Sequence, residues 1–258
     1  MARIHHALAL ASVLGITGCL DFGPAASPDG GAGGGTDAFA TGFDAPTAAL
    51  TSLAPAAFGL VDFGNRAPGQ LTLRPRLGGW HLGTTGGLLY VEITGNFRIE
   101  TDLTAGRLGA PDRPPAQPFN VAGLLARAPT QRAGQENWAL VARGMMHGVV
   151  GIEGKATHDS ATETTRRVEG AATGGLRICR LGDDLYLLAH DPEAGWQTAL
   201  DVPFVVRSDL PATLQVGVFA TGWNSLLDTL GEGEPDLEAR FDRLAVATPV
   251  TPGDCLGE

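Results

Sequence analysis

Glu100 and Asp102 are the two carboxylates in this sequence whose spacing best suits catalysis. Residues i and i+2 of a strand point to the same face, so one carboxyl could protonate a sugar leaving group while the other attacks. The next position on that face is Thr104, so no third carboxylate continues the pattern. Alternation alone equally predicts a solvated polar face. A glycoside hydrolase would need two carboxyls, from a set such as Glu92, Glu100 and Glu153, to meet on one face.

Other catalytic and metal-binding patterns are weak. The sequence has no GxSxG elbow, and Ser160 beside His158 and Asp159 does not make a triad by adjacency. CxxC and HxxxH spacings, which would indicate a metal site, are also missing. The acidic segment 228–236 could hold calcium, but it fits no EF-hand loop and is more simply a solvated loop. We therefore predict no catalytic residue, no metal ligand and no cofactor, with calcium as a weak alternative.

Sugar sites combine an aromatic platform with a few planar hydrogen-bonding side chains, and this chain has a small set of each. Arg127 is the main candidate, because it ends a strand whose other face is expected to be buried. Two alternatives stay open. Arg127 could form an ion pair with Glu136 or Glu92, and Trp223 could pack in the core or at the rim of a sheet instead of stacking on a sugar. The ligand-binding candidates are Arg127, Glu136, Trp138, Trp223 and Asn224.

The N-terminus has the features of an export signal. Arg3 precedes an apolar stretch at residues 7–16, which is too short to span a bilayer. The sequence ITGC at residues 16–19 resembles the bacterial lipobox, which implies cleavage before Cys19 and lipidation of that cysteine. Leu20 follows it where an aspartate would favour the inner membrane. The expected location is therefore the cell envelope, anchored by lipid and facing the periplasm or the surface from the outer membrane.

Composition predicts a tether after the anchor. Residues 19–50 are rich in Gly, Ala, Pro, Asp and Thr, contain no Lys or Arg, and bury too little apolar surface to fold, so we expect them to be disordered.

The whole chain of 258 residues carries 18 basic and 28 acidic side chains, a formal net charge of −10. Nucleic acid is excluded as a partner because phosphate contacts need a basic face.

Cys179 and Cys255 are the two cysteines that remain. An exported location permits a disulfide, so we predict that they pair, with two free thiols as the alternative. A bridge across so long a loop would stabilise the fold by about 4 kcal/mol.

From about residue 55, short apolar or alternating runs recur at intervals of 8–12 residues, separated by Gly, Pro, Asp and Asn. This pattern predicts an all-β, two-sheet antiparallel sandwich over residues 51–248, followed by a C-terminal tail at 249–258. A single helical turn at 226–230 and an exposed hairpin tip at 155–165 are further expectations. The predicted strands are 87–94, 96–103, 120–127, 138–143, 148–153, 163–168, 176–180, 184–190, 196–200, 213–220 and 237–246.

Five segments, in the same order along the chain, resemble elements of the concanavalin A-like lectin/glucanase superfamily, including its LamG-like jelly rolls. They are AGLLAR at 122–127 followed by NW at 137–138, LRICRLGDDLY at 176–186, HDPEAGW at 190–196, VGVFA at 216–220 and ARFD at 239–242. The resemblance spans about residues 55–247. It implies a jelly roll in which ligands lie across a concave sheet, and it places an arginine at Arg127. The glucanases of this superfamily carry three acidic residues on one concave strand, and this chain lacks that triplet.

Three functions compete at this point. The first is a non-catalytic module of an envelope lipoprotein that binds a glycan or another envelope component. The second is a structural or protein-interaction envelope protein without a small ligand. The third, a glycoside hydrolase, is the least favoured because the acidic triplet is missing, and fold alone does not decide among the three.

Overall fold

The computed structural model describes residues 37–45, 47, 49–76, 78–81, 83–84, 86–129, 134–222 and 235–257. They all belong to one unit, Gly35–Glu258. The predicted signal peptide, Cys19, the tether as far as residue 36, Trp223, Asn224 and the helical turn at 226–230 lie outside the described residues.

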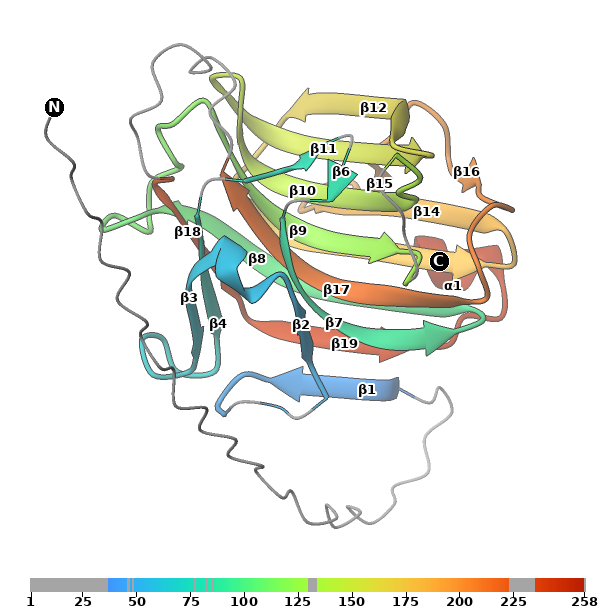
Figure 1. Cartoon of the computed structure of the whole chain (residues 1–258), viewed down its shortest axis with the longest axis horizontal. Helices are drawn as coiled ribbons and strands as arrows, with labels where there is room; N and C mark the ends of the chain where they lie inside the picture. Colours follow the sequence, from blue (N-terminus) through green and yellow to red (C-terminus); the bar gives the residue numbers. More distant parts are fainter. Residues whose placement is uncertain are drawn as a thin grey trace, which may run out of the picture. The chain divides into compact units, whose positions relative to one another are not determined.

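A seven-stranded antiparallel sheet forms one layer of the protein (Figure 1), with the strand order β12-β11-β10-β9-β17-β7-β2. Its long central strands are neighbours both in sequence and in space, joined by hairpins, except where β17 enters between β9 and β7. The strands are β2 (Thr51–Leu53), β7 (Gly87–Thr94), β9 (Phe119–Arg127), β10 (Trp138–Met146), β11 (Val149–His158), β12 (Ala161–Glu169) and β17 (Thr213–Gly222).

A ten-stranded sheet forms the second layer, with the path β15-β14-β13-β8-β18-β4-β3. Strand β19 also pairs with β8, β1 pairs with β19, and β16 pairs with β14. The strands are β1 (Asp37–Gly42), β3 (Phe58–Phe63), β4 (Leu71–Pro75), β8 (Phe97–Arg107), β13 (Thr173–Leu181), β14 (Asp184–Asp191), β15 (Gly195–Thr198), β16 (Val205–Val206), β18 (Leu237–Phe241) and β19 (Arg243–Ala247).

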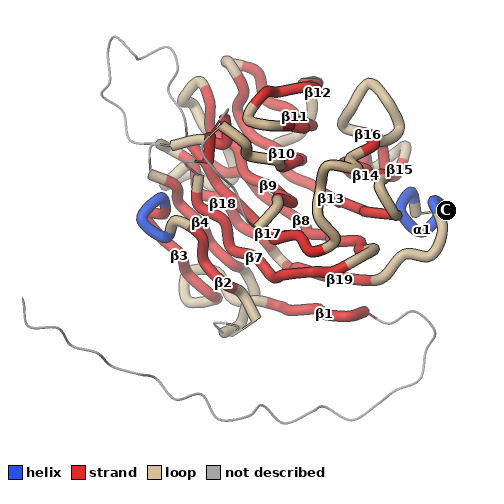
Figure 2. Tube along the Cα trace, turned by 45° about the vertical axis from the view of Figure 1, so that its right-hand side comes forward, coloured by secondary structure: helices blue, strands red, loops and turns tan. Residues whose placement is uncertain are grey.

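Three small elements complete the described fold. Strands β5 (Trp80–His81) and β6 (Gly83–Thr84) pair only with each other among the described residues. A 3-10 turn, η1 (Pro55–Ala57), precedes β3, and a short helix, α1 (Pro252–Leu256), follows β19. Figure 2 shows these two helical turns at opposite sides of the strands.

The main hydrophobic core lies between the two sheets. Strand β8 shows why the sequence pattern predicts this, because Phe97, Ile99, Thr101 and Leu103 are buried while the intervening residues are less so. Strand β9 does not alternate in this way. Its residues from Val121 to Ala126 are all apolar or glycine, because both faces of the strand are buried. Leu124 contributes to the main core, whereas Val121 and Leu125 belong to a second cluster. Burying one such aliphatic side chain completely stabilises the folded state by about 1.5–3 kcal/mol.

The second cluster lies on the face of the seven-stranded sheet that points away from the ten-stranded sheet, which we call the outer face. It contains Trp138, Leu140 and Phe219, and Trp80 packs against it. Gly217 lies on the same face, where a methyl group would overlap the carbonyl oxygen of Leu89 on the neighbouring strand. Glycine thus permits the close approach of β17 and β7.

The prediction of an all-β, two-sheet antiparallel sandwich is confirmed, and each predicted strand overlaps an observed one. The structure refines three of the expected ranges. Strand β1 pairs with β19 from Asp37, so the expected tether does not extend to residue 50. The expected C-terminal tail contains α1, whose Cys255 is buried. Residues 155–165 do form a β-hairpin with Asp159 exposed at its turn, although Lys155 and Thr157 on β11 are buried.

Candidate functional site

One row of side chains crosses the outer face of the seven-stranded sheet. Gln215 on β17 is the direct partner of Arg127 on β9, which is the partner of Trp138 on β10, which is the partner of Thr157 on β11. Directly opposite residues of an antiparallel pair point to the same face. The sheet register therefore places these four side chains next to one another, and we call them the polar row.

The polar row contains an unusual number of unsatisfied polar atoms. All four residues are at most 7% exposed. Within the described part of the protein, no hydrogen-bond partner is present for Oε1 of Gln215, Nε of Arg127, Nε1 of Trp138 or Oγ1 of Thr157. Buried polar atoms are nearly always paired, and each unpaired one costs about 1–3 kcal/mol. Four such atoms in a single row mark a place where a group outside the chain can supply the missing partners.

Trp80, on β5, covers the polar row. Its ring lies 6.1 Å from that of Trp138 in an edge-to-face arrangement, and the guanidinium carbon of Arg127 lies 6.0 Å from the Trp80 ring. Lys155 Nζ donates to the backbone oxygen of Trp80 over 3.3 Å and lies 5.0 Å from the Trp138 ring. Trp80 Nε1 also has no partner among the described residues. In this structure Trp80 therefore covers the row, and its strand β5 pairs with β6, which is labelled in Figure 1.

The ion pair that was the alternative role for Arg127 is not formed. Neither Glu136 nor Glu92 forms an ion pair with Arg127 in the described structure; Glu136 accepts hydrogen bonds from Gly134 N and Ser160 Oγ, while Glu92 accepts one from Gln215 Nε2. Burial lowers the pKa of Arg127 from its ordinary value, and the charges of Tyr90 and Glu136 only partly oppose this. Arginine nevertheless stays protonated in proteins, so Arg127 is a buried cation for which the described residues supply no ion-pair partner at contact distance.

Of the predicted ligand residues, the structure brings Arg127 and Trp138 together. Glu136 lies near Arg127 but is used to hold the β11–β12 turn through Ser160. Sequence reasoning missed Trp80, Gln215, Thr157 and Lys155, which complete the site. Their alignment depends on the register between strands distant in the chain, which no local pattern reveals.

Glu100 and Asp102 do not lie on the outer face. Both are on β8 of the ten-stranded sheet, where Glu100 forms an ion pair of 2.9 Å with Arg177 and Asp102 one of 3.1 Å with Arg243. Glu92 and Glu153 do occupy the seven-stranded sheet, but β7 and β11 are four strand spacings apart, about 19 Å. That separation exceeds the roughly 5–9.5 Å between the carboxyls of glycosidases.

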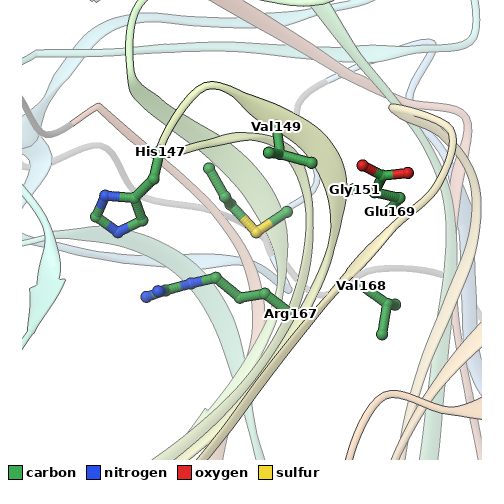
Figure 3. A pocket seen from close by; sticks show the side chains of 7 residues that line it. His147, Val149, Gly151, Arg167, Val168 and Glu169 are labelled. Atoms are coloured by element: carbon green, nitrogen blue, oxygen red, sulfur yellow. The ribbon is translucent and has the colours of Figure 1, made fainter.

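A hollow of about 500 Å³ opens at the other end of β10. Figure 3 shows His147 and Arg167 on one side of it and Glu169 on the other. Arg167 Nε forms an ion pair of 2.8 Å with Glu153, which is the diagonal neighbour of Glu169 across β11 and β12. Met146 in this hollow is eight residues from Trp138, about 26 Å along β10. The hollow is thus a separate place on the same sheet.

A second hollow, of about 620 Å³, lies between the edges of the two sheets. Arg143 lines it and is almost fully buried, donating to the backbone oxygens of Ala171 and His190 over 2.9 and 2.8 Å. These bonds tie the segment after β12 to β14, so Arg143 has a structural role there.

Within the described residues, no three His, Cys, Asp or Glu side chains are arranged to hold a metal ion. None of the helices in this part of the chain combines the length and the apolar character that a membrane span needs.

Neither protein-family models nor curated proteins match this sequence. Solved structures do match the fold. A functionally unknown protein from Saccharomyces cerevisiae is 16% identical with a TM-score of 0.55, covering 79% of this chain and 98% of that chain. The GH43 BlXynB protein from Bacillus licheniformis is 15% identical with a TM-score of 0.54, covering 81% of this chain. The CBM2 module of the Lactobacillus casei BL23 phage J-1 evolved Dit is 9% identical with a TM-score of 0.50, covering 83% of this chain and 96% of that chain.

The alignment spans 39% of the GH43 chain, so that protein has a large part with no counterpart here. At these identities the likeness concerns the fold alone. It agrees with the strand order described above: this chain is a two-sheet antiparallel β-sandwich that resembles a jelly roll.

Proposed function

We propose that this protein is a lipid-anchored, non-catalytic glycan-binding protein of the cell envelope, and that the polar row is its binding site. The observation that carries the proposal is the set of four buried, unpartnered polar atoms beside Trp80 and Trp138. Sugar rings present apolar faces that stack on tryptophan and hydroxyl groups that both donate and accept hydrogen bonds. The row offers both kinds of contact in one place.

Binding requires the β5–β6 hairpin to move. Each of its strands has two residues, and among the described residues they pair only with each other. Elements with so few backbone hydrogen bonds open at low free energy. Displacement of Trp80 would uncover the Trp138 ring and the polar atoms of Arg127 and Gln215, so that a sugar ring can take the place of the indole.

The anchor in this proposal is Cys19. The sequence between Cys19 and Asp37 is rich in glycine and contains no Lys or Arg, as expected for a tether. A protein anchored in this way suits a ligand of the envelope itself, and we place it at the outer membrane.

Fold relatives with glycoside hydrolase and CBM2 names agree with a glycan ligand, although they share only the architecture. A hydrolase remains the second candidate because Glu153 and Glu169 are diagonal neighbours on the outer face. We favour binding over hydrolysis, because Glu153 is already engaged by Arg167 and both carboxyls lie away from the polar row.

The test uses the full chain, solubilised in detergent, on a glycan array and then in calorimetry with the glycans that bind. The variant is Arg127→Met, and the matched control is Arg180→Met, a similarly buried arginine on the ten-stranded sheet. Loss of one charged hydrogen-bond donor should weaken binding about tenfold or more in Arg127→Met only.

Binding that both variants retain would place the site elsewhere. A folded protein that binds no glycan would favour a structural role. Release of new reducing ends from a bound glycan, abolished by Glu153→Gln, would establish the hydrolase.

A further inference from the structure

Gln215 and Arg127 are direct partners across β17 and β9, and both are buried on the outer face. Oε1 of Gln215 is a hydrogen-bond acceptor without a partner among the described residues, and Nε of Arg127 is a donor in the same situation. Although they come from directly opposite positions, these two atoms do not bond to each other. The pair therefore offers a ligand one acceptor and one donor in neighbouring places.

The orientation of the Gln215 amide follows from its other contact. Its Nε2 donates to Oε1 of Glu92 on β7 over 3.3 Å. A carboxylate can only accept hydrogen bonds, so the NH₂ group of the amide has to face Glu92. Oε1 is consequently the atom of Gln215 that a ligand meets, and it needs a donor.

A secondary amide suits this pair better than a single hydroxyl group does. The Cβ atoms of directly opposite residues are about 4.5–5.5 Å apart, so the acceptor and the donor belong to separate side chains. The N–H and C=O of an amide likewise lie on two different atoms and, in the trans form, point in opposite directions. An amide between the two side chains can donate to Gln215 Oε1 and accept from Arg127 Nε at once.

An apolar pair on the same face lies beside the polar row. Leu125 and Leu140 are two residues along β9 and β10 from the polar row, are direct partners of each other and are at most 2% exposed. Residues two apart on a strand share a face. The acyl methyl group of an amide held by Arg127 would therefore contact these two leucines, and a hydroxyl group has no such apolar part.

The other half of the polar row suits a hydroxyl group. Trp138 Nε1 can only donate a hydrogen bond, whereas the hydroxyl of its direct partner Thr157 can donate or accept. Neither atom has a partner within the part of the chain that the structure describes. A sugar hydroxyl, which also donates and accepts, can bind between them. The row thus combines a place for an amide with a place for a hydroxyl group.

We infer that the ligand of the polar row is an N-acylated amino sugar, whose amide binds between Gln215 and Arg127 and whose acyl methyl group packs on the leucine pair. This inference rests on the proposed function and adds the chemical class of the ligand. A sugar with a hydroxyl group in place of the amide loses the methyl contact and has a single oxygen to serve both polar partners.

The experiment compares sugars that differ only in this group. Surface-bound polymer conjugates of N-acetylglucosamine and glucose form one matched pair, and those of N-acetylgalactosamine and galactose form the other. Binding of the full chain, solubilised in detergent, should be about tenfold or more tighter for the N-acetylated member of at least one pair. N-acetylalanine methylamide carries amides without a sugar ring, and it should not compete with the conjugates.

Gln215→Met removes the acceptor and should reduce that preference to about twofold or less. Gln70→Met is the matched control, because Gln70 also donates through Nε2 to a carboxylate, that of Asp242, but lies directly before β4 of the ten-stranded sheet. The control should keep the preference unchanged. Since both sugar pairs are compared on the natural chain, the main result does not depend on the folding of Gln215→Met.

Equal binding of the acetylated and unacetylated members, or binding only of array glycans without an N-acyl group, would overturn the inference and leave the proposed function intact. Competition by N-acetylalanine methylamide would assign the pair to a peptide amide and would overturn the inference as well. A folded protein that binds none of the conjugates and no glycan on the array would overturn both.

Discussion

Arg177 donates a hydrogen bond of 2.6 Å to the backbone oxygen of Cys255, and so fastens the C-terminal helix α1 to strand β13. The same guanidinium lies 3.9 Å from the ring centroid of Trp196 and forms an ion pair with Glu100. A disulfide between Cys255 and Cys179 adds a covalent link, with 5.5 Å between the two Cα atoms. The end of the chain therefore covers the ten-stranded sheet around β13, where Cys179, Tyr186, Leu188 and Cys255 form a separate small cluster.

Replacing Cys255 with serine should lower the free energy of unfolding by about 4 kcal/mol, because the bridge closes a loop with a sequence separation of 76 residues. For a domain of this size that corresponds to a fall in Tm of roughly 8–16 °C. Thermal unfolding with and without reductant measures the effect. Reductant should destabilise the natural protein and leave Cys255→Ser unchanged, whereas equal Tm values for the two proteins would contradict a stabilising bridge.

The β1 strand should be required for full stability. It pairs with β19 from Asp37 to Gly42, although composition alone placed these residues in the tether. A chain that begins at Phe43 would leave the edge of β19 unpaired while keeping the buried Phe43, whereas one that begins at Gly35 keeps the pairing. Urea unfolding should give a lower midpoint for the shorter chain. Superimposable curves would show that β1 contributes nothing measurable.

Much of the sandwich follows from local sequence, and the failures have physical causes. Strands such as β7 and β14 are bounded by turn residues and show their apolar pattern directly, so their predicted ranges nearly coincide with the observed ones. Strand β1, with the sequence DAFATG, shows no alternating pattern of its own and pairs with β19, a partner that only the tertiary structure supplies. Propensity cannot reveal such an edge strand.

The candidate site was predictable in part for the same reason. Arg127 and Trp138 flank one hairpin, so their proximity follows from the register of adjacent strands. Gln215 comes from a strand far along the chain, and Trp80 comes from a hairpin that covers the sheet. Conversely, Glu100 and Asp102 were placed on one face correctly, but sequence alone does not say which sheet carries that face.

Gly217→Ala should destabilise the domain by about 2 kcal/mol or more, because the added methyl group would overlap the carbonyl oxygen of Leu89 and force β17 and β7 apart. Gly42→Ala is the matched control, since its methyl group would meet only a carboxylate oxygen of Asp44 at 3.9 Å. Equilibrium denaturation compares the two variants. If Gly217→Ala is as stable as the control, the close strand approach is not rigid.

Cys19→Ser should release the protein from the membrane fraction. In the lipoprotein hypothesis this cysteine carries the acyl chains, and several buried chains together make anchoring firm. Labelling with radioactive palmitate in a bacterial host should mark the natural chain and not the variant, while both remain folded. Label that persists in Cys19→Ser would disprove lipidation at this residue.

Acid should destabilise the fold through Glu238. Burial alone would raise the pKa of this carboxyl, but hydrogen bonds from Arg74 and Arg240, the shortest of which are 2.5 Å each, outweigh burial and hold the pKa below the ordinary value of 4.5. A group whose pKa is lowered by folding stabilises the native state above its unfolded pKa, and that contribution is lost as the pH falls through the lower folded value. The free energy of unfolding should therefore decline below about pH 4.5.

The decline should be shallower in Glu238→Gln, which has no carboxyl to titrate at this position, even though that variant is less stable at neutral pH. Urea unfolding at a series of pH values from 7 to 3 measures both slopes. Asp209 titrates in the same direction, because hydrogen bonds from Arg207 outweigh the effect of burial on its pKa, so some acid sensitivity should remain in the variant. Parallel pH profiles for the two proteins would show that the contacts with Arg74 and Arg240 do not favour the ionised form of Glu238.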